Sequence, residues 1–456
     1  MKIEEIYVKE IEQRIPSDVL WIIDMLENRG YEAYAVGGCV RDCIMGETPK
    51  DWDITTSAKP MEVKSIFRKT IDTGLQHGTV TVRKGGENYE VTTYRIDGDY
   101  SDGRHPDSVE FTSDLKEDLK RRDFTINAMA YNPKNGIIDE FGGIEDLERK
   151  VIKCVGVAHE RFTEDALRIL RAVRFAARFG FEIDDETIKV MEELAPNLEL
   201  ISKERVNAEL DKLLVSSHPE MFRILYETGI TKVIMPAFDE MMKTEQNTPY
   251  HDSTVGEHTL KVLVNIKNDH YLRWAALFHD MGKPQCKTTD EEGVDHFKGH
   301  AKISSDIAKE ELKNLKFDND TVDIVTKVVA CHSDLTGSFP NTDKALRRAV
   351  SRIGKKYFPY FLELFEADLN GKSEYGKSRS IDTLNFAKDG FKRILEREDA
   401  LEIKDLKITG NDLIKLGMKP GKEMGACLKE LLDLVIDDPE LNDYDFLVNK
   451  VKEKYL

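Results

Sequence analysis

The hydrophobic pattern changes once along this chain, and that change limits the folds that are open to it. Residues 31 to about 155 contain short apolar runs typical of strands, separated by turn residues. One pair of runs, 79–83 and 89–95, flanks a glycine-rich turn and predicts a hairpin. From Glu164 to the C-terminus, the apolar residues recur mostly at helical spacing. The sequence therefore predicts an α+β fold, with a mixed sheet in the head and a long, mostly α-helical remainder.

Length and composition narrow the class of protein. The 456 residues are enough for about three domains. Lys and Arg number 67 against 85 Asp and Glu, a net charge of −18, so any contact with nucleic acid must come from local basic patches. The apolar runs are far shorter than the ~18 residues of a membrane span, and the start lacks the pattern of a signal peptide. Six scattered Cys without a CxxC pattern favour a reduced, cytoplasmic protein.

Polar interruptions at 243–252 and 368–380 suggest where the helical part divides. We expect four regions, which are a head at 1–155, a helical neck at 156–245, a body at 246–375 and a helical tail at 376–456. In the tail, Thr409 or Asn411 is the expected cap of a helix.

Two aspartates, Asp51 and Asp53, form a DWD pattern in a predicted strand. On a strand, this spacing places both carboxylates on one face and Trp52 on the other. Two convergent carboxylates are costly unless a divalent cation neutralises them, and Mg²⁺ favours one or two carboxylates together with substrate phosphates. Upstream, Gly37 and Gly38 end a strand and open a helix, where free N–H groups can approach a phosphate. Taken singly, DWD is most often a pair of surface acids, and Gly-Gly a tight turn.

Four arginines, Arg168, Arg171, Arg174 and Arg178, follow one another at steps of 3, 3 and 4 residues, which places them on one helix face. No acid lies between them. The pattern predicts a row of unpaired guanidiniums, able to bind phosphate or the edge of a base. The alternative is a surface helix whose arginines pair with acids elsewhere in the fold.

Four segments of the first 181 residues occur together in one order. They are VGGCVRDCIMGETPKDWDI (36–54), RRDFTINAMAYNP (121–133), DEFGGIEDL (139–147) and EDALRILRAVRFAARFGF (164–181). This order resembles the class II nucleotidyltransferases, the superfamily of bacterial tRNA nucleotidyltransferases (CCA-adding enzymes) and poly(A) polymerases. The resemblance implies a head with the polymerase β-like nucleotidyltransferase fold.

The resemblance also implies a catalytic role for the acids of the head. Asp51 and Asp53 would bind two Mg²⁺ ions that activate the RNA 3′-hydroxyl and steady the leaving pyrophosphate. Glu90, on the second strand of the predicted hairpin, is a candidate third metal carboxylate, although a glutamate on a strand is usually only solvated.

The resemblance assigns the incoming nucleotide to ten residues of the head and neck. They are Gly37, Gly38 and Arg41 for the triphosphate, Arg122 for the nucleotide, Asp123 and Asn127 near the ribose, Asp165 and Arg168 for the base edge, and Arg171 and Arg174 for the rest of the pocket. Protein, not a nucleic-acid template, would then select C or A. The polar stretch 97–107 lies where the family has a flexible loop for switching from CTP to ATP, which favours complete CCA addition.

A second set of residues lies in the helical body. In chain order it consists of His258, His279, Asp280, His300, His332 and Asp368. A single histidine on an apolar face is more often a core residue than a ligand. The ordered series, however, resembles the HD phosphohydrolase superfamily. Some bacterial CCA-adding enzymes carry such a domain, with phosphatase and 2′,3′-cyclic phosphodiesterase activities.

The second resemblance implies that His258, His279, Asp280 and Asp368 hold one divalent metal ion. The remaining two histidines would complete a second site or contact phosphate. Imidazole with carboxylate suits Mn, Fe, Ni or Co better than Mg. The alternative is a degenerate HD domain that is purely structural.

Taken together, the sequence predicts a tRNA nucleotidyltransferase that adds or repairs the 3′-terminal CCA of tRNA from CTP and ATP, with a second, metal-dependent phosphohydrolase activity. Such an enzyme would be a monomer or homodimer that does not bind membranes. The alternatives are a poly(A) polymerase, an enzyme that adds only CC or only A, and an HD phosphohydrolase whose head binds RNA without catalysis. Basic clusters at 120–122, 347–352 and 355–356 are candidate contacts for the tRNA backbone.

Overall fold

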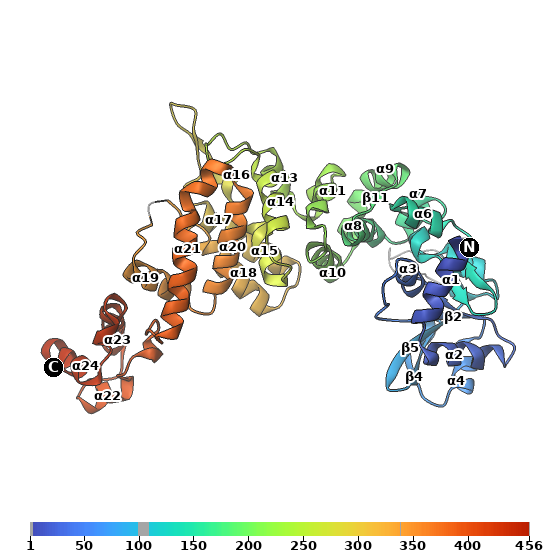
Figure 1. Ribbon diagram of the computed structural model, residues 1–456, viewed down its shortest axis with the longest axis horizontal. Coiled ribbons are helices and arrows are strands. Elements are labelled where there is room, and N and C mark those ends of the chain that lie inside the picture. The colour runs from blue at the N-terminus through green and yellow to red at the C-terminus, as the bar shows by residue number, and fades with distance from the viewer. Residues whose placement is uncertain (1–2, 99–108, 338, 456) are drawn as a thin grey trace. The chain divides into compact units, whose positions relative to one another are not determined.

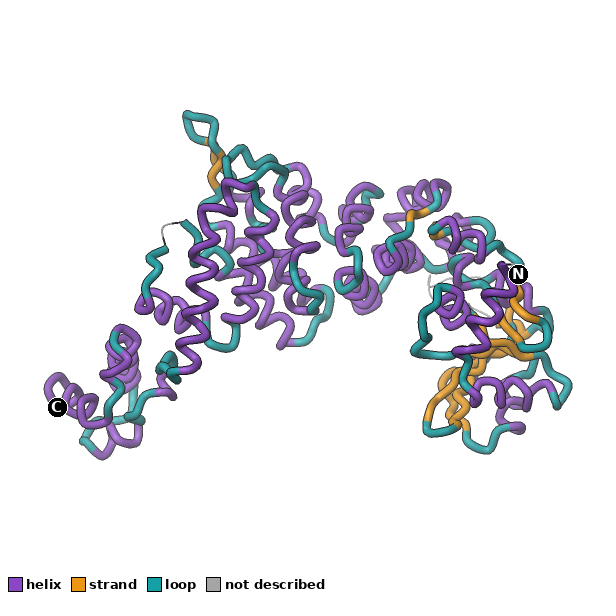
Figure 2. Tube along the Cα trace, in the orientation of Figure 1, coloured by secondary structure: helices purple, strands orange, loops and turns teal. Residues whose placement is uncertain are grey.

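The computed structural model describes residues 3–98, 109–337 and 339–455, and it divides into two compact units, Met1–Ile234 and Met235–Leu456. Strands gather in the first unit, and helices form most of the second (Figures 1 and 2). The α+β fold class is therefore confirmed. The division into four regions stays a prediction, and residues 99–107 of the predicted loop lie outside the described part of the chain.

The first unit is built on a seven-stranded sheet with the order β3-β4-β5-β2-β1-β8-β9. The strands are β1 (Ala33–Val36), β2 (Asp53–Thr56), β3 (Thr70–Gly74), β4 (Thr79–Lys84), β5 (Glu87–Thr93), β8 (Ala130–Asn132) and β9 (Gly136–Ile138). Strands β2 and β5 are parallel and every other neighbouring pair is antiparallel, so the sheet is mixed, as expected. The predicted hairpin is confirmed as β4–β5.

Strand β2 begins at Asp53, and the prediction that the strand already includes Asp51 is wrong. Burial nevertheless alternates as the pattern requires, because Trp52 is 7% exposed while both aspartates are exposed. The buried indole lies on the protein side of the chain and turns the carboxylates outward.

Helices surround this sheet and continue beyond it. In the first unit they are α1 (Ile3–Arg14), α2 (Ser17–Glu27), α3 (Gly38–Ile44), α4 (Pro60–Ile66), α5 (Leu115–Lys120), α6 (Gly143–Arg149), α7 (Ala158–Glu164), α8 (Leu167–Phe179), α9 (Asp185–Leu194), α10 (Lys203–Leu214), α11 (Phe222–Glu227) and α12 (Thr231–Ile234). Helix α8 buries Ile169, Leu170 and Val173. It ends at Gly180, whose φ of +69° requires a glycine and where an added Cβ would lie 2.7 Å from the His218 ring.

The second unit is almost wholly helical. Its helices are α13 (Pro236–Lys243), α14 (Val255–Asn265), α15 (His270–Phe278), α16 (Lys283–Cys286), α17 (His300–Asn314), α18 (Asn319–Cys331), α19 (Asp343–Ile353), α20 (Phe358–Gly371), α21 (Glu374–Glu396), α22 (Gly410–Lys415), α23 (Lys422–Asp437) and α24 (Tyr444–Tyr455). Helices α14, α15, α18, α20 and α21 form a bundle (Figure 1). A short hairpin, β12 (Thr288–Thr289) with β13 (Asp295–His296), interrupts the helices.

Two predictions about helix boundaries in this unit have different outcomes. The polar interruption predicted at 368–380 is wrong, because α20 runs to Gly371 and α21 starts at Glu374. The Ser373 hydroxyl caps α21 by accepting a hydrogen bond from the Gly376 N–H, which lets a polar stretch begin a helix. In the tail, Thr409 is confirmed as the cap of α22.

Arginines predicted to contact tRNA instead fasten the tail to the body. The Arg347 side chain is buried and donates to the carbonyl oxygens of Ile436 and Asp437, at the end of α23. Arg348 makes two bonds to the Asp437 carboxylate, at 2.7 and 2.8 Å. A basic side chain at a helix C-terminus satisfies carbonyls that have no partner within the helix. The prediction of a tRNA contact is therefore wrong for Arg347.

All six cysteines are free, as the sequence predicts. Among the described residues, no helix combines the length and the apolar character needed to cross a membrane.

Candidate nucleotide site and metal cluster

The acids of the head meet where two parallel strands lie side by side. Asp53 on β2 and Glu90 on β5 are paired in register. Side chains at paired positions of neighbouring strands share a face, so the two carboxylates are neighbours, with Asp51 just before β2. Both paired side chains reach solvent. Partial removal from water raises the pKa of Asp53, the positive charge of Arg122 opposes this, and the negative charges of Glu90 and Asp51 add to it.

Gly37 lets an arginine approach the start of α3. Its φ is +80°, and a Cβ there would lie 2.9 Å from Nη1 of Arg122. The Gly37 N–H donates to the Met129 carbonyl oxygen at 2.9 Å. The expectation that this N–H is free for a phosphate is therefore wrong. At Gly38, a Cβ would lie 3.4 Å from the guanidinium of Arg41.

Asp118, which sequence reasoning missed, organises the arginines of the RRDF segment. The carboxylate is fully buried and accepts hydrogen bonds from Thr55 and from two nitrogens of Arg121. Nη2 of Arg122 lies 3.5 Å away. The Arg122 Nε is buried without a hydrogen bond among the described residues, so this arginine keeps an unused donor. In the sequence, the signal for Asp118 is its spacing of three and four residues before Arg121 and Arg122, which does not reveal its burial.

Arg41, Asp123 and Asn127 form one buried network. Arg41 donates to Asn127 and to Asp42, and its guanidinium lies 4.9 Å from the ring centre of Phe179. Asn127 in turn donates to Asp123 at 3.1 Å. The structure therefore brings together three residues assigned to the nucleotide, although Arg41 is only 3% exposed.

The prediction of a row of unpaired arginines on α8 is wrong, and the alternative holds. Each arginine has an acidic partner, and the pairs are Arg168–Glu164 at 2.6 Å, Arg171–Asp123 at 2.5 Å, Arg174–Glu209 at 2.6 Å and Arg178–Asp42 at 3.2 Å. Three of these acids come from other elements of the unit. Asp165, the expected partner in reading the base edge, accepts from Arg205 of α10 at 2.6 Å and from the Leu167 N–H, so its side chain is not bonded to Arg168.

The predicted metal ligands of the second unit come from five different segments. His258 lies in α14 and Asp368 in α20, while His300 begins α17. His332 follows the last residue of α18. Helix α15 ends at Phe278 and leaves His279 and Asp280 in the turn after it.

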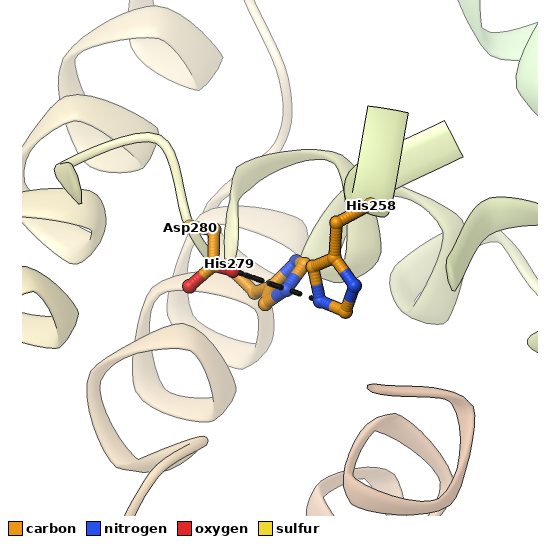
Figure 3. Close-up of side chains that lie close together, drawn as sticks. All are labelled: His258, His279 and Asp280. Carbon is orange, nitrogen blue, oxygen red and sulfur yellow. Dashed lines mark ion pairs between the residues drawn. The ribbon is translucent and has the colours of Figure 1, made fainter. Parts of the chain in front are cut away.

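The structure brings all six of these residues together. Nε2 of His258 lies 2.9 Å from Asp368. It lies 3.7 Å from Asp280, and Nε2 of His279 lies 3.1 Å from Asp280 (Figure 3). The other oxygen of Asp280 lies 3.4 Å from His300 and 3.6 Å from His332. Two groups of three ligand atoms, each within 4.8 Å of one another, result among the described residues, both in the second unit.

Backbone carbonyls fix the orientation of all four histidines. Each Nδ1 faces a carbonyl oxygen, which can only accept, and the pairs are His258–Gly371 at 3.1 Å and His279–Ala276, His300–Phe297 and His332–Val329 at 2.7 Å each. The Nδ1 atoms therefore carry the protons, and the Nε2 lone pairs point into the cluster, as in proteins that hold metals through histidine.

The remaining contacts show that these lone pairs lack donors. Nε2 of His279 is buried and makes no hydrogen bond among the described residues. Nε2 of His300 lies 3.1 Å from Nε2 of His332, so two acceptors face one another. A cation between such atoms relieves both defects, so the residues present fit a metal ion.

The ionisation states suit the same ligand set. Burial lowers the pKa of His258 and lowers that of His300 to about 4, so both imidazoles are neutral at pH 7. Burial would raise the pKa of Asp280, but its contacts with His279 and Lys283 outweigh it and hold the carboxyl well below its usual range. Nζ of Lys283 lies 2.7 Å from Asp280, and Nζ of Lys372 lies 2.6 Å from Asp368.

Two glycines permit this packing. A Cβ on Gly371 would lie 3.1 Å from the His258 ring. A Cβ on Gly282, in the turn after Asp280, would lie 2.6 Å from the Ser304 nitrogen and 2.7 Å from the His300 carbonyl oxygen. The HDMG segment can therefore approach α17 only because no side chain stands at its fourth position.

Three family models match successive parts of this chain. Residues 33–153 match the family model described as the poly A polymerase head domain. Residues 180–242 match "Probable RNA and SrmB-binding site of polymerase A", and residues 288–451 match "tRNA nucleotidyltransferase domain 2 putative".

Curated relatives extend the likeness to nearly the whole chain. The CCA-adding enzyme of Leuconostoc mesenteroides is 35% identical over 434 residues, which are 95% of this chain and 95% of the relative. This chain belongs to the CCA-adding enzyme family. The CCA-adding enzyme of Pediococcus pentosaceus is 36% identical over 443 residues, 96% of this chain and 97% of that one. The crystal structure of the Bacillus stearothermophilus CCA-adding enzyme in complex with CTP matches with a TM-score of 0.69 at 30% identity, covering 96% and 98% of the two chains.

Proposed function

We propose that this chain adds or repairs the 3′-terminal CCA of tRNA, using CTP and ATP and no nucleic-acid template. Family membership supports the class of reaction, and relatives have been crystallised with CTP, ATP and tRNA. The observation that carries the proposal for this chain is the Asp53–Glu90 pair on parallel strands, beside an Arg122 that keeps an unused donor.

The residues of the head fit a divalent cation, because partial burial and the two neighbouring carboxylates, Glu90 and Asp51, raise the pKa of Asp53, and a cation would relieve the negative charge gathered there. Asp51 and Asp53 would hold Mg²⁺, with Glu90 as a third carboxylate. Bound there, two such ions would supply activation of the 3′-hydroxyl and charge neutralisation at the leaving pyrophosphate.

The chain's own cations would bind and orient the nucleotide. Arg122 approaches over Gly37, and its partly exposed guanidinium would bind the triphosphate. Arg171 is fixed to Asp123, and Arg174 to Glu209, so each presents its guanidinium in one orientation. Arg168 is paired with Glu164, and Asp165 accepts a hydrogen bond from Arg205. Base selection by Asp165 and Arg168 therefore requires these two side chains to exchange some of those bonds for bonds to the base edge.

Incorporation into a tRNA that lacks CCA tests this proposal. With CTP alone we expect two added nucleotides, with ATP alone none, and with both the complete CCA. Long A tails on arbitrary RNA would identify a poly(A) polymerase, and a product that stops after CC would identify a CC-adding enzyme. No incorporation by a folded, tRNA-binding protein would leave the head as a binding module only.

We further propose that the buried cluster of the second unit holds a transition metal, Mn, Ni, Co or Fe, and hydrolyses a phosphate ester. The facing lone pairs of His300 and His332 support this proposal over a purely structural cluster. A bound metal would supply an activated water and a Lewis acid. Asp280 and Asp368 would ligate it, and Lys283 and Lys372 would balance their charges and contact the substrate phosphate.

Phosphate release in the presence of Ni²⁺ or Mn²⁺ tests the second proposal. We expect Asp280→Asn to abolish release and leave CCA addition unchanged. Asp290→Asn is a matched control, because Asp290 is an exposed aspartate paired with His296 on the β12–β13 hairpin. Equal activity in the Asp280 variant would contradict the metal assignment. Cytoplasmic location and the monomer or homodimer state stay predictions of the sequence.

A further inference from the structure

A cavity of about 500 Å³ opens above the metal cluster in the second unit. His300, His332 and Asp368 contribute to its floor. The cluster therefore borders a space large enough for a nucleoside phosphate rather than for phosphate alone.

The lining of this cavity carries surplus positive charge. Lys283 and Lys372 balance the two cluster aspartates. Asp295 is the remaining acid of the lining, and it is paired with Lys287 at 2.8 Å. Lys298 and Arg379 also line the cavity, are exposed, and make no ion pair that the described part of the chain shows. Two cations beyond those needed for internal balance favour an anionic ligand.

An exposed aromatic ring faces the same cavity. Tyr250 lines it and is 42% exposed, and its ring centre lies 5.4 Å from that of Tyr375, which is 48% exposed. Because both tyrosines are exposed, their contact at the edge of a charged pocket does not form part of the hydrophobic core. Such rings instead offer a flat surface on which a nucleobase can stack.

The position of Tyr250 is fixed by its backbone. The Tyr250 carbonyl oxygen accepts from the Ser373 N–H at 3.1 Å, and the Ser373 hydroxyl donates to the Pro249 carbonyl oxygen at 2.7 Å. An added Cβ on Gly376 would lie 2.6 Å from the Tyr250 oxygen. The loop before α14 is therefore held against the first turn of α21, the helix that also supplies Arg379 and Tyr375.

We propose that Tyr250, backed by Tyr375, is a base-stacking platform that makes the second site specific for nucleoside phosphoesters. This inference rests on the proposed hydrolytic activity and adds its specificity. The phosphate lies toward the cluster and the lysines, and the base lies on the tyrosine ring. A free mononucleotide and the phosphorylated end of an RNA share this chemistry.

Kinetics with paired substrates test the platform. With the Ni²⁺-loaded enzyme, Tyr250→Ala should raise KM for adenosine 3′-monophosphate about tenfold, the usual size of a lost stacking contact. KM for glycerol 3-phosphate should stay unchanged, because that substrate has no base. Tyr250→Phe should behave as the wild type, since stacking needs the ring and not the hydroxyl. Tyr444→Ala, at an exposed tyrosine of the tail that is 43% exposed, is the matched control.

A second pair of substrates distinguishes a free mononucleotide from the phosphorylated end of an RNA as the preferred substrate. A short oligoribonucleotide with a 3′-phosphate is compared with adenosine 3′-monophosphate, and the higher kcat/KM identifies whether an RNA end or a free nucleotide is preferred. Tyr250→Ala should lower kcat/KM for both, because each places a base beside the phosphate.

Photo-crosslinking gives a readout that does not depend on activity. We expect 8-azidoadenosine 3′-monophosphate to label the peptide that contains Tyr250. Labelling there without hydrolysis would overturn the proposed activity and keep the platform. Hydrolysis of both small substrates with equal KM in wild type and Tyr250→Ala would overturn the platform and keep the activity. Labelling confined to peptides of the head would also overturn the platform.

Discussion

The head and the second unit each contain acids suited to a metal ion, but the two sites differ in how far the protein assembles them alone. In the head, Asp51, Asp53 and Glu90 are exposed, and the positive charge of Arg122 only partly offsets their mutual repulsion. In the second unit, Asp280 and Asp368 are 2% and 5% exposed, and each has a lysine and histidines around it.

This difference follows from the cost of burying charge. A buried carboxylate must be compensated by the protein, whereas an exposed one is compensated by water until a ligand arrives. The cluster is thus organised before metal or substrate binds. The acids of the head depend on the cation and the triphosphate to complete their site. The ordered part of that site is the set of surrounding arginines, which acidic partners hold in place.

Replacing an acid of either site gives the largest expected effects. We expect Asp53→Asn to lower CCA addition about a thousandfold, because charge stabilisation by metal ions amounts to several kcal/mol. Metal-dependent phosphate release should stay unchanged. Incorporation of radiolabelled nucleotide measures CCA addition, and a phosphate assay on the same protein measures the release. Asp72→Asn, at an exposed acid of β3 paired with Lys64, is the control. Loss of both activities would contradict the separation of the sites.

Thermal unfolding compares metal binding at the two sites without relying on a catalysed reaction. At about 100 times its dissociation constant, Ni²⁺ should stabilise the second unit by about 2.7 kcal/mol, since binding to the folded state adds directly to stability. Differential scanning calorimetry should show this as a higher Tm of one transition. Asp280→Asn should remove the shift, while Asp53→Asn should keep it. An equal shift in both variants would place the stabilising ion elsewhere.

Acid should weaken the head through Asp123. Burial would raise the pKa of this carboxyl, but the charge of Arg171 and the hydrogen bond from Asn127 outweigh it and hold the pKa well below its usual range. The stabilisation is therefore complete above pH about 4 and is lost as pH falls toward the folded-state pKa. The difference in unfolding free energy between wild type and Asp123→Asn, about 2 kcal/mol at pH 7, should shrink below pH 4 in urea titrations. A difference that is constant with pH would contradict the ionised pair.

The smallest effect concerns the arginines behind the exposed acids. Asp118→Asn removes the charge that fixes Arg121 and Arg122. We expect KM for CTP to rise about tenfold, the value of one charge-assisted contact, with a smaller change in kcat. Circular dichroism checks the fold. A change in kcat alone would show that Asp118 acts on the reacting atoms and not on nucleotide binding.

Local patterns predicted the parts of the fold whose partners are close in sequence. The β4–β5 hairpin, the cap at Thr409 and the alternation around Trp52 each depend on residues within one turn or strand. Spacing also predicted which face of α8 carries its arginines. It could not predict that Glu209 and Asp42 neutralise that face, because both come from other helices.

The same limit applies to the two candidate sites. The order of histidines and aspartates identified the members of the cluster but not the Nδ1 contacts that orient them, since carbonyls carry no sequence signature. Asp118 was missed because an acid near arginines looks like any solvated pair until its burial is known.

One carboxylate belongs to both halves of the cluster. An oxygen of Asp280 faces His258 and His279, and its other oxygen faces His300 and His332. Two ions bound there would share this one ligand, so a single substitution at the bridge should empty both halves together.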